Sequence, residues 1–194
     1  MTNEGILLEL LKEVVFLDRD GTINRDSPDY IKSCSEFEFL PGAVAAIAKL
    51  TAAGFTCLVA TNQSGLARGF ISTAELDAIH ARMCDEIAAG GGKITDIFHC
   101  PHLPQDACTC RKPAPGLLLQ ARQKYNIALA DAVMIGDSAK DIECGRAAGC
   151  GRTVLVKSGI DAAVEAQLRA KQISADYVAA DLLEAAEWII AAKT

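Results

Sequence analysis

Two aspartates, Asp18 and Asp20, flank Arg19 directly after an apolar run at residues 14–17. The run predicts a short buried strand, and residues two apart on an extended segment point the same way. Both carboxylates would then face one ligand at the carboxyl end of the strand, where open α/β sheets bind ligands. Because paired like charges are costly without a proton or a cation between them, the pair indicates nucleophilic, acid–base or metal chemistry. A plain acidic turn is the alternative for these residues alone.

Other polar residues are expected at the same edge, because the carboxyl ends of parallel strands lie together. Thr61 and Asn62 close one apolar run, and Asp137 follows another. Arg111 and Lys112 supply cations just before the start of a helix. Carboxylates, a hydroxyl and cations at one edge suit metal-assisted phosphoryl transfer, since the negative charge of a phosphate must be offset before a carboxylate attacks it.

The elements that position these residues alternate between apolar runs and alanine-rich stretches, which predicts strands alternating with helices. Ser72 and Glu75 match a capping box, and Asp181 is suited to cap the last helix. Repeated β-α units predict a Rossmann-like parallel sheet with helices on both faces, and no linker divides the single domain expected over residues 1–194. Strands are expected at 14–17, 55–60, 94–100, 132–135, 153–156 and 177–179, and helices between 42 and 54, from 73 towards 90, at 115–125, from 138 to 149 and after 181.

Composition limits the classes of function. With 194 residues and a net charge of -6, the chain has no basic stripe, so we expect no nucleic-acid partner. No apolar run approaches the roughly 20 residues of a membrane span, and no basic region precedes the short apolar stretch at residues 6–11, as a secretory signal would require. We therefore expect a cytoplasmic protein, and a monomer, whose eight cysteines are reduced or bind metal.

A second constellation of possible ligands lies in the loop at about residues 99–111. Three thiols and an imidazole at C-x-H and C-x-C spacing suit a closed, tetrahedral structural zinc site, with ordinary loop cysteines as the alternative. Such a zinc would order a short polar loop and position the Arg111 and Lys112 that follow it. The neighbouring His99 could compete as the imidazole ligand. The expected ligands are Cys100, His102, Cys108 and Cys110.

In order along the chain, the motifs DRDGT from residue 18, TN from 61, K at 112 and GDSAKD from 136 resemble the haloacid dehalogenase (HAD) superfamily of phosphatases. The longer strings LDRDGTIN, TNQSGLARG and CPH followed by CTCRKPAPG are similar to one family within it, the D-glycero-D-manno-heptose 1,7-bisphosphate 7-phosphatases. The likeness spans residues 14–159 and leaves the first dozen residues and the last helix outside any motif. Within it, the family pattern favours His102 over His99.

The resemblance implies a Mg²⁺-dependent phosphatase that removes the C7 phosphate of a small sugar bisphosphate, for ADP-heptose and lipopolysaccharide core synthesis. Asp18 would be the nucleophile that forms an aspartyl-phosphate, and Asp20 the general acid and base, with Arg19 structural on the opposite face. Thr61 and Lys112 would contact the phosphoryl oxygens. Mg²⁺ would bind the carboxylate of Asp18, the backbone carbonyl of Asp20 and the side chain of Asp137.

Substrate contacts are expected from loops, because only a minimal cap fits between the first motif and Pro41. Arg111 is the first candidate for the second phosphate, and Arg68 is equally suited to be a surface arginine. The resemblance gives no fixed role to Ser138, Lys140 or Asp141, although Asp141 could hold Lys112, hold a metal-bound water or be a plain acid at a helix start. The candidates for the substrate-binding loops are Asp26, Ser27, Pro28, Asp29, Asn62, Gln63 and Ser64.

Two alternatives remain for the function. The short zinc loop also resembles histidinol-phosphate phosphatases, although the string TNQSGLARG is of the heptose type and the chain has no partner dehydratase domain. A different class is a zinc-stabilised binding module whose catalytic site has been lost. The retention of Asp18, Asp20, Lys112 and Asp137 argues against that class.

Overall fold

The computed structural model describes residues 10–193, so most of the apolar stretch at 6–11 lies outside the described part. Its centre is a six-stranded sheet in the order β3-β2-β1-β4-β5-β6, and every pair of neighbouring strands is parallel. This is the doubly wound order in which ligands bind where the strand order reverses, beside β1 and β4. The strands are β1 (Val14–Leu17), β2 (Thr56–Asn62), β3 (Ile94–Cys100), β4 (Val133–Gly136), β5 (Arg152–Val156) and β6 (Tyr177–Ala179).

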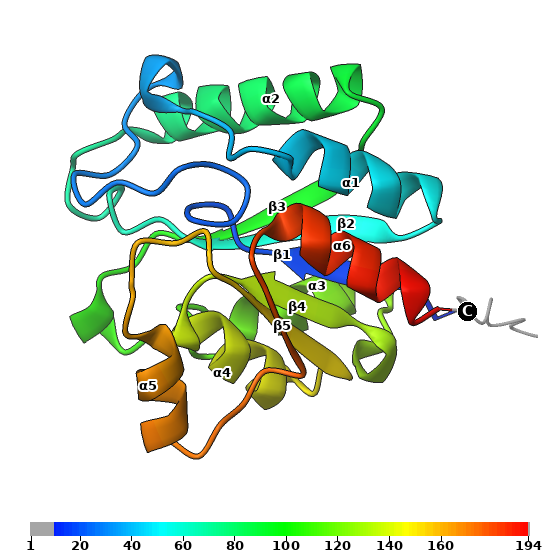
Figure 1. The fold of residues 1–194 in the computed structure, drawn as a ribbon. Helices are drawn as coiled ribbons and strands as arrows, with labels where there is room; N and C mark the ends of the chain where they lie inside the picture. The colour runs from blue at the N-terminus through cyan, green and yellow to red at the C-terminus, as the bar shows by residue number, and fades with distance from the viewer. Residues whose placement is uncertain (1–9, 194) are drawn as a thin grey trace, which may run out of the picture.

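Helices cover both faces of the sheet (Figure 1), which confirms the predicted α/β architecture. One layer holds α1, α2 and α6, and the other holds α3, α4 and α5. The helices are α1 (Ala43–Ala52), α2 (Thr73–Ala89), α3 (Gly116–Tyr125), α4 (Ala139–Ala148), α5 (Val164–Ala170) and α6 (Leu182–Ala191).

Strand β1 shows why the apolar runs are continuous rather than alternating. Val15 and Leu17 pack into the core beneath α1, α2 and α6, whereas Val14 and Phe16 pack into the core beneath α3 and α4. All four side chains are fully buried. A strand covered on both faces needs apolar residues at every position, so the run VVFL holds β1 in the middle of the sheet.

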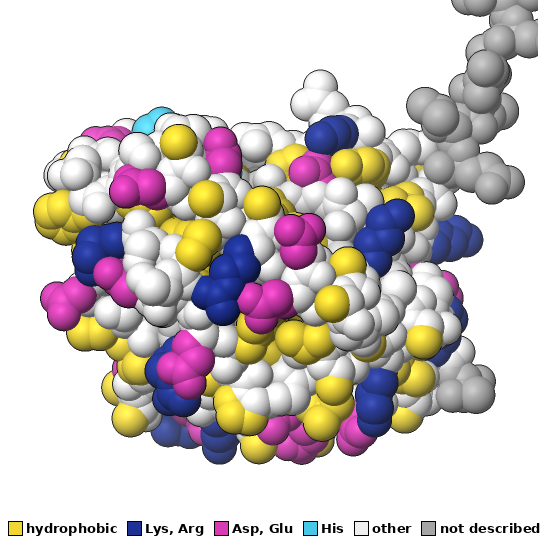
Figure 2. Space-filling model, turned by 90° about the horizontal axis from the view of Figure 1, so that it is seen from above, with side chains coloured by type: hydrophobic (Ala, Val, Ile, Leu, Met, Phe, Trp, Pro, Cys, Tyr) yellow, Lys and Arg dark blue, Asp and Glu magenta, His cyan; other side chains and the backbone are white. Residues whose placement is uncertain are grey.

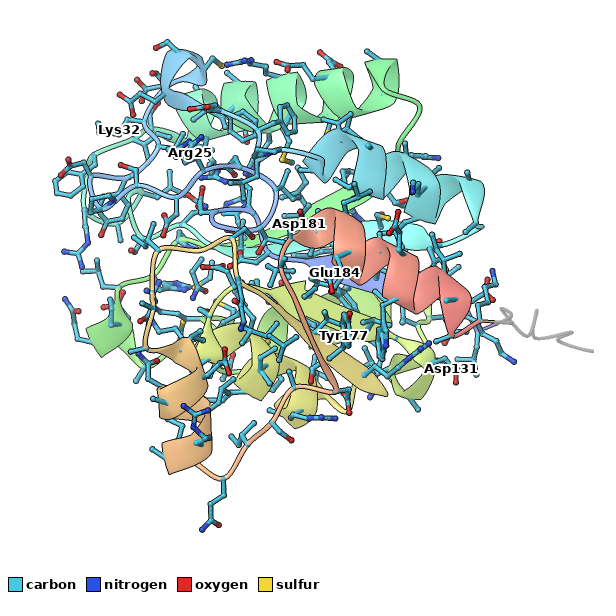
Figure 3. The ribbon with its side chains drawn as sticks, viewed as in Figure 1. Arg25, Lys32, Asp131, Tyr177, Asp181 and Glu184 are labelled. Carbon is cyan, nitrogen blue, oxygen red and sulfur yellow. The ribbon has the colours of Figure 1, made fainter. Side chains whose placement is uncertain are left out.

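Local sequence signals fix the ends of the helices. Ser72 and Glu75 form the expected capping box at the start of α2. At α6, the Asp181 side chain accepts a hydrogen bond from the Glu184 backbone N–H at 2.9 Å. Figure 3 shows these two residues near Tyr177 of the edge strand, whose hydroxyl donates to Glu184 at 2.6 Å. The cap and the tyrosine together attach the last helix to β6.

Thr61 and Asn62 are the last two residues of β2, so they lie at the strand end where they were expected. The structure differs from the predicted elements in its short helices. Helix α5 was not predicted, because its seven residues give only a single apolar pair, Val164 and Leu168, at helical spacing. The described chain also contains 3-10 turns, of which Cys34–Glu36 is the only helical turn between β1 and α1. The segment at 18–42 is therefore a loop rather than a cap domain.

The surface is mixed in character. On the face seen in Figure 2, lysines and arginines alternate with aspartates and glutamates, and the apolar side chains are scattered between them. Within residues 10–193, none of the helices combines the length and the apolar character needed to cross a membrane.

Candidate active site

The turn after β1 brings its polar side chains to the switch point of the sheet. The backbone N–H of Asp18 donates to the Ile135 carbonyl of β4 at 2.9 Å, which places Asp18 between the two central strands. The chain then turns at Gly21, whose φ of +80° lies in the left-handed region that favours glycine. A Cβ on Gly21 would lie 2.5 Å from the carboxyl group of Asp137. The glycine therefore permits both the turn and the close approach of Asp137.

Three carboxylates converge beside this turn. Asp18, Asp137 and Asp141 each offer an oxygen within 4.8 Å of the others, and all three are at least nine-tenths buried. Burial raises the pKa of Asp18 and of Asp137, and the neighbouring carboxylates raise both further. A divalent cation would relieve this repulsion, and a set of carboxylate oxygens suits Mg²⁺. The residues present therefore fit the expected metal.

Lys112 is the cation inside this cluster. Its Nζ lies 2.8 Å from Oδ1 of Asp18 and 2.6 Å from Oδ1 of Asp141, and the side chain is 2% exposed. Burial lowers its pKa, but the carboxylates of Asp141 and Asp18 outweigh burial and raise the pKa above its ordinary value. Asn62 fixes the backbone of Lys112, since its amide donates to the Lys112 carbonyl at 3.1 Å and accepts from the Lys112 N–H at 3.0 Å. The Asn62 amide thus supports Lys112 through both of these bonds.

Asp20 occupies a different environment from the three clustered carboxylates. The Arg19 guanidinium donates to both of its oxygens, at 2.8 and 2.9 Å, and Asn24 and Gln63 each donate to one oxygen at 2.9 Å. Burial favours the neutral acid, but the charge of Arg19 and these hydrogen bonds outweigh it and lower the pKa of Asp20. Gln63 also donates to the Thr61 hydroxyl at 2.9 Å. Asp20 is therefore held as a carboxylate in one fixed orientation.

The placement of Arg19 on the opposite face from Asp20 was wrong. The strict alternation of a strand ends at Leu17, and the turn brings the Arg19 side chain back onto Asp20. Arg19 is only 1% exposed, and its Nη1 lies 3.3 Å from Nε2 of His80 on α2. His80 is a buried neighbour of this ion pair. Burial, with the charge of Arg19, lowers the pKa of His80 to about 3.

A cavity of about 250 Å³ opens above these groups. Among the loop residues considered for the substrate, Pro28, Asp29 and Arg68 are absent from its lining. Tyr30 and Ile31 line it although the sequence interpretation missed them. The signal that could have found Tyr30 was its position directly after the candidate loop at 26–29. The lining residues are Asp18, Asp20, Asp26, Ser27, Tyr30, Ile31, Thr61, Asn62, Gln63, Ser64, Arg111, Lys112, Asp137, Ser138 and Lys140.

A second hollow of about 330 Å³ adjoins this cavity. Arg111, Lys112 and Lys140 line both spaces. The remaining lining of the second hollow comes from the loop that carries the cysteines, including Pro104 and Cys108. Two cations, Arg111 and Lys140, therefore stand where an anionic group could extend away from Asp18.

The four expected zinc ligands lie together in the structure. Cys110 Sγ is 3.2 Å from Cys100 Sγ, 3.5 Å from Cys108 Sγ and 3.3 Å from His102 Nδ1. A tetrahedral zinc with bonds of about 2.3 Å to sulfur separates its sulfur ligands by roughly 3.8 Å. The present spacings are slightly shorter, and the four ligand atoms lie close enough together to hold one metal ion. A backbone hydrogen bond connects this cluster to the catalytic cavity, because the Arg111 N–H donates to Cys108 Sγ at 3.4 Å and Arg111 lines the cavity. His99 lies outside the group of four.

Comparisons with known proteins give the same class. A family model described as "HAD-hyrolase-like" matches residues 109–185. The chain is 48% identical over 148 residues to D-glycero-beta-D-manno-heptose-1,7-bisphosphate 7-phosphatase of Pseudomonas aeruginosa, covering 76% of this chain and 83% of the relative. It is 44% identical over 157 residues to the protein of that name from Bordetella bronchiseptica, covering 76% and 88%.

A solved structure agrees with the sequence relatives. The fold matches the crystal structure of D,D-heptose 1.7-bisphosphate phosphatase from B. bronchiseptica complexed with magnesium and phosphate, with a TM-score of 0.87 and 41% identity over 93% of this chain and 99% of that chain. Together with the sheet order and the paired aspartates after β1, these matches define a phosphatase of the HAD-like hydrolase class. Within that class, the chain belongs to the D-glycero-D-manno-heptose-1,7-bisphosphate 7-phosphatase family.

Proposed function

We propose that this phosphatase removes the phosphate at C7 of D-glycero-D-manno-heptose 1,7-bisphosphate and leaves the phosphate at C1. The observation that carries the proposal is the identity of 48% to a relative named for this reaction, combined with a cavity that joins the aspartates to two further cations. The relatives from Pseudomonas and Bordetella are named for the β anomer, so we infer a preference for that anomer here.

Asp18 is the nucleophile in this proposal. One of its carboxylate oxygens attacks the C7 phosphorus, the bond from phosphorus to the sugar oxygen breaks, and an aspartyl-phosphate forms. Lys112, 2.8 Å from Asp18, and the Thr61 hydroxyl at the cavity wall stabilise the phosphoryl oxygens. Mg²⁺, held by the carboxylates of Asp18 and Asp137 and the carbonyl of Asp20, would offset the remaining negative charge. Asp141 holds Lys112 in place through its ion pair at 2.6 Å.

Asp20 is the general acid and then the general base. It gives a proton to the leaving sugar oxygen and later takes one from the water that hydrolyses the aspartyl-phosphate. The ion pair with Arg19 favours the ionised form, which is the form that the second step requires. The negative charge of an incoming phosphate raises the pKa of a neighbouring carboxyl group, which favours the protonated form in the first step.

The remaining residues of the site bind the substrate or support the binding loops. Asp26, Ser27 and Ser64, which line the cavity, are suited to the sugar hydroxyls, and Arg111 with Lys140 to the phosphate at C1. A structural zinc on Cys100, His102, Cys108 and Cys110 would fix the loop from which Arg111 and Lys112 extend.

The product suggests a place for the reaction. A heptose that keeps its anomeric phosphate is the form a nucleotidyl transfer needs, so we infer a role in making ADP-heptose for the lipopolysaccharide core. We further infer that the chain acts as a single catalytic domain, as a monomer and in the cytoplasm. Sedimentation velocity of the purified protein tests the monomer.

The experiment that tests the proposed function compares phosphate release with Mg²⁺ from the two anomers of the heptose bisphosphate and from histidinol phosphate. We expect a large kcat/KM preference for the heptose, with the C1 phosphate left intact when the product is examined by ³¹P NMR. Asp18→Asn is the matched control and should release no phosphate. A preference for histidinol phosphate, or release of the C1 phosphate, would overturn the proposal.

A further inference from the structure

We infer that Ser158 and Gly159, in the loop between β5 and α5, are positioning residues that hold the Asp137 carboxylate in its metal-binding orientation. The inference rests on the proposed function only in taking Asp137 as a ligand of Mg²⁺. Figure 1 shows this loop passing beside the turn that follows β1. Neither residue belongs to the motifs that carry the chemistry, and neither lines the catalytic cavity.

Gly159 lies against the side chain of Asp137. A Cβ on Gly159 would be 2.0 Å from Oδ2 of Asp137 and 2.7 Å from its Cβ and Cγ. Its φ lies outside the left-handed region, so an alanine is compatible with the backbone here. The requirement for glycine at this position is therefore purely one of space beside the carboxylate.

Gly21, in a different chain segment, also restricts the space around the Asp137 carboxyl group. A Cβ on Gly21 would be 2.5 Å from Oδ2 of Asp137 and 2.5 Å from its Cγ. Two backbone segments, one after β1 and one after β5, thus approach the same carboxyl group more closely than a side chain on either would allow. The Thr22 hydroxyl, 3.5 Å from Oδ1, adds a polar neighbour to this enclosure.

Ser158 connects these two segments. Its hydroxyl donates to the Gly21 carbonyl at 2.7 Å, in a partly buried contact between residues that are far apart in the sequence. This bond holds the loop after β5 to the turn that carries Asp20. The position of Gly159 against Asp137 therefore depends on Ser158, and the rotamer of Asp137 depends on both.

Loss of these contacts to Asp137 should weaken Mg²⁺ binding more than it slows the chemical step. Asp137 is 8% exposed, and its carboxylate has little room to reach a ligand position from a different rotamer. Outer contacts that orient metal ligands change metal affinity by about 10- to 100-fold when they are removed. We expect a loss in that range for Gly159→Ala and a smaller loss for Ser158→Ala.

The test measures Mg²⁺ binding by isothermal titration calorimetry to the zinc-loaded, substrate-free protein, with Mn²⁺ electron paramagnetic resonance as a second readout. Gly159→Ala and Ser158→Ala are compared with Ser158→Thr, which keeps a hydroxyl donor. Ile160→Ala, a change at a side chain 62% exposed in the same loop, is the matched control and should bind as the parent protein does. Circular dichroism checks that each variant is folded.

Weaker binding in Gly159→Ala and Ser158→Ala, with recovery in Ser158→Thr, supports the inference. Parental affinity in folded Gly159→Ala overturns it. Where Gly159→Ala does not fold, the two Ser158 variants decide, and equal affinities in both overturn the inference. These binding measurements contain no substrate, so they test only the positioning of Asp137. The proposed function is tested separately, by the comparison of substrates.

Discussion

The Arg19 guanidinium donates from Nη2 to both carboxylate oxygens of Asp20, at 2.8 and 2.9 Å, although the two residues are adjacent in the sequence. Asp20 lines the cavity and its side chain is 22% exposed, whereas Arg19 is almost completely buried and is absent from the cavity lining. An arginine behind a carboxylate fixes the direction of its free lone pairs and stabilises its ionised form. Arg19 therefore acts on the proposed chemistry through Asp20 and touches no substrate itself.

The first prediction concerns this ion pair. Arg19→Gln should lower kcat by roughly 10- to 100-fold. Proton transfer by a positioned group accelerates a reaction by about 10²- to 10⁴-fold, and a misaligned Asp20 would lose only part of that acceleration. Arg19→Gln should also raise the pKa of Asp20, so the limb of the pH–kcat profile that depends on Asp20 should move to higher pH. Steady-state kinetics across pH measures both effects.

The matched control for that experiment is Arg25→Gln. Arg25 forms an exposed ion pair with Glu38 at 3.1 Å on the same loop, and such pairs contribute little. Figure 3 shows it above the sheet, near Lys32. An Arg19 variant with parental kcat and an unmoved pH profile would contradict the positioning role.

The second prediction is a pH dependence of stability from His80. Its pKa is about 3 in the folded protein against 6.5 as the ordinary value, because burial and the charge of Arg19 disfavour the protonated ring. The unfolded chain then binds more protons between these values, so stability is complete above pH 6.5 and is lost as the pH falls towards 3. At pH 5 this single group would destabilise the fold by about 2 kcal/mol.

Urea unfolding of the parent protein and of His80→Gln at several pH values measures this effect. Glutamine can still accept a hydrogen bond from Arg19 but does not titrate. The difference in the free energy of unfolding between the two proteins should therefore narrow as the pH falls from 7 to 5. The groups facing His80 are Arg19, Asp20 and His99, and they remain in both proteins. A difference that stays constant over this range would show that His80 does not carry the effect.

How far the sequence could predict this site depends on how local each signal is. The strand ends Leu17 and Gly136 followed from apolar runs and turn residues, so the meeting of Asp18 with Asp137 could be predicted. The contact of Arg19 with His80 could not, because it joins residues 61 positions apart through the direction of one turn. Short helices such as Val164–Ala170 leave too little periodicity to detect.

The same limit applies to the glycines. Gly21 could be assigned to a turn from its sequence neighbours, but the approach of Gly159 to Asp137 depends on the packing of a loop after β5. No spacing rule connects those two residues. Contacts that are set by tertiary packing between loops, rather than by periodicity, are therefore the part of the site that required the structure.

The third prediction concerns the cluster of cysteines and histidine. Cys108→Ser should remove bound zinc, weaken protection of residues 99–111 in hydrogen exchange and raise KM more than it lowers kcat, because Arg111 and Lys112 extend from that loop. Metal analysis of the purified protein, followed by hydrogen-exchange mass spectrometry, measures the first two effects.

Cys34→Ser, at a partly buried thiol outside the cluster, is the control. Purified parent protein without zinc, active with Mg²⁺ alone, would contradict this prediction.

The fourth prediction separates the two phosphates of the substrate. Arg111 and Lys140 line both the catalytic cavity and the hollow beside it, whereas Asp18, the proposed nucleophile, lines only the first. Hydrogen bonds to charged groups contribute about 1.5–3 kcal/mol, so Arg111→Ala or Lys140→Ala should raise KM for the bisphosphate by roughly 10- to 100-fold. With heptose 7-phosphate, which has no second phosphate, the same variants should have the KM of the parent protein.

Arg68→Ala, at an exposed arginine outside the cavity lining, is the matched control and should leave KM for both substrates unaffected. Equal losses for the two substrates would instead place these cations at the reacting phosphate.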